Sequence, residues 1–219
     1  MQLDLTMDND VLIKCSCYSL LGEVSPSGQQ GNTVGVLGAA RFVVGKYLER
    51  RGRITDRESA RQRFEEFLSS VVELEPTADE LELSSAIEEA AVRAGVELDS
   101  GESQLCAIAV RRGPMLLLTG DKRAIAGAEV VQHEVTELSG LAGSIVCLEQ
   151  VIAGISERLG VTVVRERICA EPQVDKTLSI CFQCHSAQPR PDSFIDGLLS
   201  YVHHMRTQAA SLLYVHDRF

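Results

Sequence analysis

Apolar and polar positions along the chain follow two periods that predict different elements. Apolar residues at every third or fourth position indicate an amphipathic helix, whereas a short unbroken apolar run indicates a strand covered on both faces. The stretch 98–121 contains both patterns. Helical spacing continues to Arg112, Pro114 prevents the helix from continuing, and Met115–Thr119 forms the apolar run. This stretch therefore predicts a helix, a turn and a buried strand, with Asp121 just beyond the strand.

The same patterns predict the other elements of the chain. Strands are predicted at 2–7 and 129–132. Helices are predicted at 11–21, 33–51 and 144–159, after a capping box at 55–58, and at 81–94 after a second capping box at 77–80, with Gly95 as the stop. A final helix capped by Asp192 has a buried stripe of Phe194, Leu198, Val202, Met205 and Leu212. The segment 25–32 predicts a loop, 169–191 an irregular connection, and 161–168 either a strand or a helix.

The order of these elements predicts the fold class. A strand followed by acids, several helices, and then a helix, a strand and another acid is typical of an α/β three-layer sandwich with a central parallel sheet. The pattern changes after Gly160. We therefore expect a main domain at residues 1–160 and a mainly helical C-terminal extension at 161–219 that docks on the main domain.

Composition limits the classes of protein to which the chain can belong. With 45% hydrophobic and 24% charged residues, it should fold around a globular core. No apolar run approaches the roughly 18 residues that suggest a membrane span, and acids near the N-terminus replace the positive charge of a secretory signal. We therefore expect a cytoplasmic protein without membrane association, whose seven cysteines are reduced thiols.

Charge narrows the expected partners. The formal net charge of −10 argues against a protein that coats nucleic acid without regard to sequence. It is compatible with a nuclease that has an acidic metal site, and equally with a basic protein partner. The densest basic stretch runs from Lys46 to Arg63 and is either a solvated face or a contact with RNA, for which Arg50, Arg51 and Arg53 are the candidates.

The candidate chemistry centres on acids near the ends of the predicted strands. Asp8 and Asp121 each follow a strand, and in a parallel sheet both would lie at the carboxyl edge, where open α/β folds bind ligands. Glu102 begins the helix before the second strand and can share that site. Mg²⁺ requires oxygen ligands and retains several waters, so a few convergent carboxylates suffice. Such a metal can activate water and stabilise a phosphodiester's developing charge.

Each of these acids also has a purely structural interpretation. Asp99 and Glu102 have the spacing of a capping box, in which the glutamate bonds the backbone at the helix start. Asp8 and Asp121 occupy loop positions after strands, where aspartate commonly forms turns. Spacing alone leaves both interpretations open.

Three short segments, taken in order, resemble the motifs of PIN-domain nucleases. They are Asp8–Ile13, similar to an acid before x-Asn/Ser-Val-Leu-Ile; Leu98–Ala109, similar to a Gly-Glu-x-x-x-x-Ala-x-Ala helix; and Leu116–Ala124, similar to a strand followed by Thr-x-Asp. Together they cover roughly residues 3–126. The resemblance implies an Mg²⁺- or Mn²⁺-dependent endoribonuclease, frequently the toxin of a toxin–antitoxin pair. Asp8, Glu102 and Asp121 would then be its catalytic and metal-binding residues.

The chain also departs from the pattern of that family. Family members usually carry another acid in a helix between the first and central motifs, and here only Glu49 is available. Asp10 replaces a small polar residue, and it becomes a further candidate metal ligand. A non-catalytic PIN-like module that binds RNA or a protein partner is therefore the alternative function. A basic antitoxin and a homodimer are both compatible with the sequence.

A third hypothesis arises from the cysteines of the C-terminal extension. Cys181 and Cys184 form a Cys-x-x-Cys motif, with Cys169 upstream and His185 adjacent, which is ligand-like spacing for zinc. One such motif without a clear second pair is a weak signal. A zinc-stabilised regulatory protein is thus the least favoured hypothesis, and zinc is not the expected cofactor.

Overall fold

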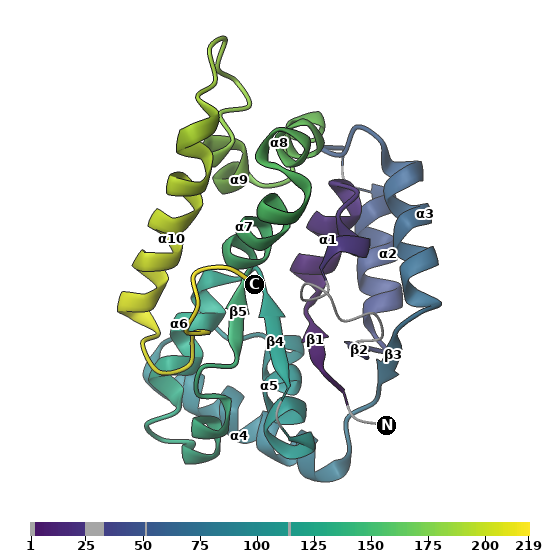
Figure 1. Cartoon of the computed structure of the whole chain (residues 1–219). Helices are drawn as coiled ribbons and strands as arrows, with labels where there is room; N and C mark the ends of the chain where they lie inside the picture. Colours follow the sequence, from purple (N-terminus) through teal and green to yellow (C-terminus); the bar gives the residue numbers. More distant parts are fainter. Residues whose placement is uncertain (1–2, 25–32, 51, 114) are drawn as a thin grey trace.

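The computed structural model describes residues 3–24, 33–50, 52–113 and 115–219. Within these residues, the chain forms a five-stranded, fully parallel sheet with the order β3-β2-β1-β4-β5 (Figure 1). The strands are β1 (Leu5–Met7), β2 (Val34–Leu37), β3 (Val72–Leu74), β4 (Leu116–Thr119) and β5 (Ile145–Cys147). The predicted α/β fold with a central parallel sheet is therefore confirmed.

Helices connect these strands and make up most of the C-terminal part of the chain. They are α1 (Asn9–Cys17), α2 (Ala40–Arg50), α3 (Arg57–Leu68), α4 (Ala78–Ala94), α5 (Ser100–Arg112), α6 (Lys122–Val131), α7 (Leu148–Leu159), α8 (Val161–Ala170), α9 (Lys176–Cys181) and α10 (Phe194–Gln208). Short 3₁₀ helices lie at Leu21–Glu23, Thr136–Leu141 and Pro191–Ser193.

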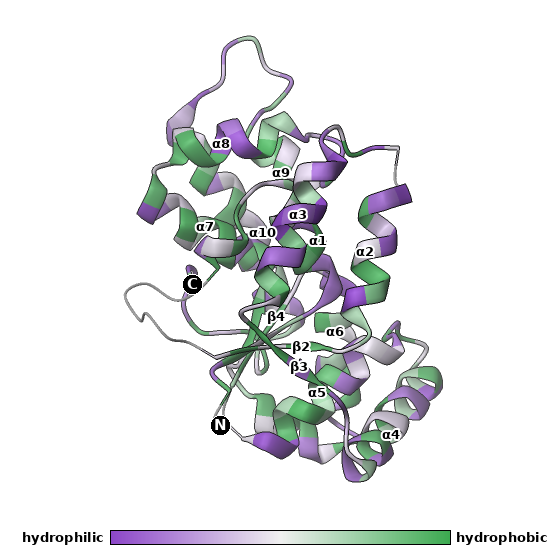
Figure 2. Ribbon diagram, turned by 90° about the vertical axis from the view of Figure 1, so that its right-hand side faces the viewer, coloured by the Kyte–Doolittle hydropathy of each residue, from purple (hydrophilic) through white to green (hydrophobic). Residues whose placement is uncertain are grey.

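Helices cover both faces of the sheet and create two apolar cores. One core contains residues of α1, α2, α3 and α7, such as Phe64, and the other contains residues of α4, α5 and α6, such as Ile108. Leu117 and Leu118 of β4 contribute to opposite cores, as expected for a strand buried on both faces. The strands in the middle of the molecule accordingly carry mainly hydrophobic residues (Figure 2).

Local capping signals set several helix boundaries where the sequence predicts them. Thr77 caps α4 and forms both bonds of a capping box with Glu80. Gly95 ends that helix with a positive φ of 68°, a conformation that glycine adopts without steric cost. In α3, by contrast, the capping side chain is Asp56, which accepts from the backbone N–H of Ser59, rather than the expected Thr55.

The region 33–51, predicted as one helix, is instead a strand followed by a helix. Residues 34–37 form β2, and α2 begins at Ala40. The helical prediction for the first part is wrong because tertiary packing decides here. A Cβ on Gly35 would lie only 2.7 Å from Leu74 Cδ1 and 3.3 Å from Leu3 Cδ2. The missing side chain of this glycine therefore allows β2 to lie close to both leucines.

Two other predicted elements change type in the structure. The strand predicted at 129–132 is the end of α6, in which Ile125, Ala128 and Val131 are buried at helical spacing. The helix predicted at 144–159 begins as β5 and becomes α7 only at Leu148. Both errors arise because a short apolar segment fits a strand and a buried helix equally well until its neighbours are known.

The boundaries near the N-terminus shift by a few residues. The strand predicted at 2–7 is observed as β1 over its last three residues, and the helix predicted at 11–21 runs from Asn9 to Cys17. The helix starts early because Asp8 caps it. The loop predicted at 25–32 lies outside the described residues.

The C-terminal extension packs against the main domain at several points. Residues 161–170 form helix α8, which decides between the two predicted alternatives, and α9 lies within the segment predicted as irregular. The residues of the predicted stripe are all buried. However, Asp192 lies in a 3₁₀ turn and does not cap the helix, and α10 ends at Gln208, so Leu212 packs from the segment beyond it. Beyond α10, Leu213 forms a parallel bridge with Ile145 of β5.

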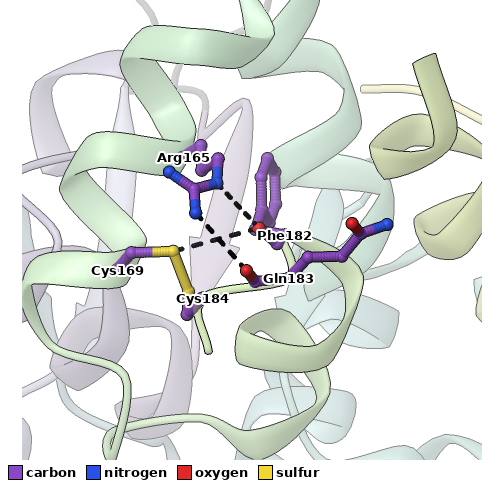
Figure 3. Close-up of a disulfide and its surroundings, with 5 residues drawn as sticks. All are labelled: Arg165, Cys169, Phe182, Gln183 and Cys184. Carbon is purple, nitrogen blue, oxygen red and sulfur yellow. Dashed lines mark hydrogen bonds between the residues drawn. A yellow bond between two sulfur atoms is a disulfide. The ribbon is translucent and has the colours of Figure 1, made fainter. Parts of the chain in front are cut away.

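The extension contains a disulfide between Cys169 and Cys184 (Figure 3). The expectation that all cysteines are reduced thiols is therefore wrong for this pair. The turn after α9 folds back onto the end of α8 and brings together two residues that are 15 positions apart. The free cysteines Cys15, Cys17, Cys106, Cys147 and Cys181 are all buried. None of the helices in the described residues has the length and apolar character needed to cross a bilayer.

Candidate active site

The predicted acids emerge at the carboxyl edge of the sheet, between its central strands β1 and β4. Met7 pairs with Leu118, so Asp8 and Asp121 leave the sheet on neighbouring strands. From β1 the sheet continues through β2 to β3, and from β4 it continues to β5 in the opposite direction. Such a reversal of strand order is the position at which open α/β sheets commonly bind ligands.

Asp8 is buried and held by three donors. Its Oδ1 accepts from the backbone N–H of Val11 at 2.8 Å, which caps α1. Its Oδ2 accepts from the Thr119 hydroxyl and, at 3.3 Å, from the backbone N–H of Gly120. Burial, together with the negative charge of Asp10, raises the pKa of Asp8 to about 7 in spite of these hydrogen bonds.

Glu102 lies in the first turn of α5 and takes part in the capping box that its spacing predicts. Its Oε2 accepts from the Asp99 N–H at 2.9 Å, while its own N–H donates to Asp99 Oδ1 at 2.8 Å. Burial raises the pKa of Glu102 to about 8, and the negative charges of Asp99, Asp121 and Asp8 act in the same direction. The capping role and a place among other acids are therefore both present.

Asp121 caps α6 and is neutralised by a neighbouring arginine. Its Oδ1 accepts from the backbone N–H of Arg123 at 2.8 Å, and its Oδ2 lies 3.1 Å from Arg123 Nη2. Burial alone would raise the pKa of Asp121, but the hydrogen bonds and charge of Arg123 lower it overall. Arg123 also pairs with Glu97 at 2.5 Å.

These acids line one cleft, which we call the carboxylate cleft, with a volume of about 260 Å³. Its acidic lining residues are Asp8, Asp10, Asp99, Glu102 and Asp121. Their charges act on one another: Asp10 raises the pKa of Asp8, Asp121 raises those of Asp10 and Glu102, and Asp8 raises that of Glu102. Sequence reasoning therefore selected residues that the fold brings together.

Asp10 is tied to a residue of the C-terminal extension that sequence reasoning missed. The Lys14 Nζ lies 2.5 Å from Asp10 Oδ2 and 2.7 Å from Asp175 Oδ2. Burial raises the pKa of Asp10, although Lys14 opposes the shift. Asp10 also approaches the turn after β4 so closely that a Cβ on Gly120 would overlap its carboxylate. No sequence spacing indicated the contact with Asp175, because 161 positions separate it from Lys14.

A second ion pair, in which the carboxylate is buried and the lysine partly exposed, lies beside this network and was also missed. Lys122, the residue after Asp121, places its Nζ 2.5 Å from Glu149 Oε1 of α7 and 5.5 Å from the ring centre of Tyr201. Glu149 is buried, and its Oε2 has no hydrogen-bond partner among the described residues.

The remaining predicted residues lie elsewhere. Glu49 is near the end of α2, where it pairs with Arg61 at 3.1 Å, and it does not line the carboxylate cleft. Arg50 and Arg53 are exposed and also lie outside the cleft lining, whereas Arg51 is outside the described residues. The structure thus brings Asp8, Asp10, Glu102 and Asp121 together, but not these basic residues or Glu49.

No ready-made ligand set is present in the described part of the chain: no group of three or more His, Cys, Asp or Glu side chains could hold a metal ion as these side chains stand. In the cleft, Glu102 is bonded to the backbone of Asp99 and Asp121 to Arg123. The cysteines of the zinc hypothesis are also engaged, since Cys169 and Cys184 are bonded to each other and Cys181 is buried.

Comparison with known proteins does not identify a relative: no family model, no curated protein and no solved structure matches this chain.

Proposed function

We propose that the protein is a metal-dependent endoribonuclease that hydrolyses RNA phosphodiester bonds in the carboxylate cleft. The observation that carries this proposal is the convergence of Asp8, Glu102 and Asp121, from β1, α5 and β4, at the reversal point of a parallel sheet. RNA as the substrate comes from the resemblance of the three short motifs to PIN-domain nucleases. A role as the toxin of a toxin–antitoxin pair, with a basic antitoxin as partner, has the same basis.

The residues of the cleft fit Mg²⁺ or Mn²⁺ in their chemistry. All three carboxylates offer hard oxygen ligands, which these cations prefer. Two of them have pKa values raised by burial and by neighbouring acids, and a divalent cation would offset that repulsion. Binding requires rearrangement, however, because the oxygens of Glu102 and Asp121 now bond Asp99 and Arg123.

The side chains of the cleft supply positioning and proton transfer. Asp8 is fixed by bonds from α1 and from the turn after β4, so its carboxylate cannot move far. The pKa values of about 7 for Asp8 and about 8 for Glu102 lie near neutral pH, where a carboxyl group can hold or accept a proton during hydrolysis. A divalent cation held by Asp8, Glu102 and Asp121 would activate water and stabilise charge on the phosphate.

A non-catalytic PIN-like module that binds RNA or a protein partner is the second candidate. It is favoured by one observation: every predicted ligand already serves another bond, with Asp10 on Lys14, Glu102 on Asp99 and Asp121 on Arg123. In that case the acids would act as helix caps, and metal would have no effect.

Replacement of Asp8 and Asp121 by asparagine distinguishes the two candidates. Asparagine keeps the shape of the side chain and its capping ability but removes the charge. We expect each variant to lose Mg²⁺- or Mn²⁺-dependent cleavage of a labelled single-stranded RNA by about 10²-fold or more. In metal-free Asp8→Asn, relief of the buried repulsion opposes loss of the bonds that Oδ2 accepts from Thr119 and Gly120, so thermal melting is measured beside cleavage to separate loss of activity from loss of folding.

Glu49→Gln is the matched control, since Glu49 lies outside the cleft and should leave cleavage unchanged. Full activity in Asp8→Asn or Asp121→Asn would refute the metal-nuclease proposal. Absence of cleavage and of metal binding in the wild-type protein would favour the non-catalytic module.

A further inference from the structure

The segment between Cys169 and Cys184, which we call the clasped segment, extends two carboxylates into the main domain. Glu171 is buried and accepts from the backbone N–H groups of Thr55 at 2.8 Å and Asp56 at 2.7 Å, at the start of α3. Asp175 lies 2.7 Å from Lys14 on α1, and its side chain is 9% exposed. Both contacts join the extension to helices that pack on the same face of the sheet.

A single side chain, that of Lys14, connects Asp175 to the carboxylate cleft. Lys14 lies between Asp175 and Asp10, and only 13% of its side chain is exposed. Asp10 lines the cleft, and its charge raises the pKa of Asp8. The position of the Lys14 ammonium group therefore depends on one carboxylate inside the cleft and one in the extension.

Two features hold the end of the clasped segment against α8 (Figure 3). The first is the disulfide. The second is Arg165, which donates from Nε to the Phe182 carbonyl at 3.0 Å and from Nη2 to the Gln183 carbonyl at 3.3 Å. Gln183 has a positive φ of 50°, which is uncommon for a residue with a Cβ. This turn brings Cys184 back to Cys169.

We propose that Asp175 is a positioning residue for the carboxylate cleft, and that the Cys169–Cys184 disulfide keeps it in place. Asp175 shares the Lys14 ammonium group with Asp10, so Asp10 is only partly neutralised and the three groups together carry one net negative charge. Without Asp175, Lys14 neutralises Asp10, and the cleft attracts a divalent cation less strongly. The part of this inference that concerns metal rests on the proposed function; the position of Lys14 does not.

The Cys169–Cys184 disulfide also makes the contact between Asp175 and Lys14 sensitive to reductants. Both cysteines are only partly buried, so a small dithiol can reach the bond. Each reduction transfers two electrons and two protons from the dithiol, which gives two cysteine thiols and the oxidised, cyclic form of the reagent. Phe182 and Leu178 remain buried anchors of the segment. We therefore expect reduction to loosen the Asp175 contact rather than to release the extension.

Asp175→Asn tests the positioning role without removing the helix cap. Asp175 Oδ1 caps α9 by accepting from the Leu178 N–H at 2.9 Å, and asparagine caps as well as aspartate. In metal-free protein, acylation of Lys14 by an amine-reactive ester, measured by mass spectrometry, should be about fivefold faster or more, because local opening exposes the amine. Labelling of Lys46, which is exposed, serves as the internal control and should not change.

The second measurement concerns metal in the same variant. Loss of one negative charge near the cleft should raise the Mn²⁺ concentration for half-maximal RNA cleavage about three- to tenfold, with little change in the maximal rate. Faster Lys14 labelling in a protein that cleaves no RNA at all would support the positioning role while refuting the proposed function. Unchanged Lys14 labelling would overturn the positioning role whatever the activity.

The role of the Cys169–Cys184 disulfide is tested separately, with dithiothreitol and with the paired variant Cys169→Ser, Cys184→Ser. Both should make Lys14 labelling faster, as Asp175→Asn does, but to a smaller extent. In the paired variant, dithiothreitol should have no further effect. If Lys14 labelling is the same with and without the disulfide, the disulfide does not hold Asp175, and that part of the proposal is wrong.

Discussion

Two helices of this protein begin with the same capping box but place their glutamates in opposite electrostatic surroundings. In α4, Glu80 bonds the backbone of Thr77, and in α5, Glu102 bonds the backbone of Asp99. Arg112 donates to both carboxylate oxygens of Glu80, so hydrogen bonding from Arg112 lowers the pKa of Glu80. No such cation bonds Glu102 among the described residues, and burial raises its pKa to about 8.

The difference shows that a local motif does not determine what its side chain does. Both glutamates satisfy a free N–H at a helix start, which is the structural role of a capping box. Only Glu102 lies among other acids without a cation bonded to it in the described residues, in a cleft at the edge of the sheet. An unpaired carboxylate with a strongly raised pKa is the kind of group that marks a functional site.

The largest expected difference between the two glutamates is in catalysis. Glutamine can retain the capping bond but is a poorer metal ligand, so Glu102→Gln should lower metal-dependent RNA cleavage by about 10²-fold or more. Glu80→Gln, the matched change in the other capping box, should leave cleavage within about twofold, since Glu80 lies outside the cleft. Rate measurements on both variants, with thermal melting as a control for folding, check this. Equal loss in both would mean that the two capping boxes have the same structural role.

The second difference is in stability. Arg112→Met leaves the buried Glu80 without its cation and should lower the free energy of unfolding by about 3 kcal/mol. Glu102→Ala removes a cap, but it also removes a carboxyl group whose ionised form is unfavourable where it lies, so its cost should be about 1 kcal/mol or less. Urea denaturation at neutral pH measures both. A larger loss for Glu102→Ala than for Arg112→Met would show that the two roles are reversed.

The third expected difference is an opposite dependence of stability on pH. The pKa of Glu102 rises from about 4.5 to about 8 on folding, so its contribution to stability is fully present below about pH 4.5 and is lost as pH rises towards 8. The pKa of Glu80 is lowered, so its contribution is present above its unfolded pKa and is lost on acidification. Compared with wild type, metal-free Glu102→Gln should therefore gain relative stability between pH 5 and 8.

Unfolding of the two glutamine variants from about pH 3 to pH 8 provides the test, because the change expected for Glu80 falls below the unfolded pKa of glutamate. Glu80→Gln should instead lose its disadvantage as the pH falls below the unfolded pKa of glutamate. Parallel pH profiles for the two variants and wild type would contradict the assigned difference in pKa. Added Mn²⁺ should stabilise wild type more at pH 8 than at pH 5, because protons compete with the metal for carboxylates.

The sequence by itself determined the features that depend on neighbours along the chain. The capping box at Thr77, the stop at Gly95 and the capping box at Asp99 appear where the sequence predicts them, because each requires only a few adjacent residues. The parallel arrangement followed from apolar runs alternating with helices. It placed Asp8 and Asp121 at one edge before any contact was known.

Tertiary structure alone decided the features that depend on distant residues. Residues 34–37 pair with β1 and β3, and Gly35 lies so close to Leu74 that a Cβ there would overlap it; the local apolar pattern alone fits both a strand and a helix. The contact of Lys14 with Asp175, the pairing of Cys169 with Cys184 and the arginine that neutralises Glu80 all join segments far apart in the chain. The electrostatic energy of a side chain depends on burial and on nearby charges, and folding, rather than local spacing, sets both.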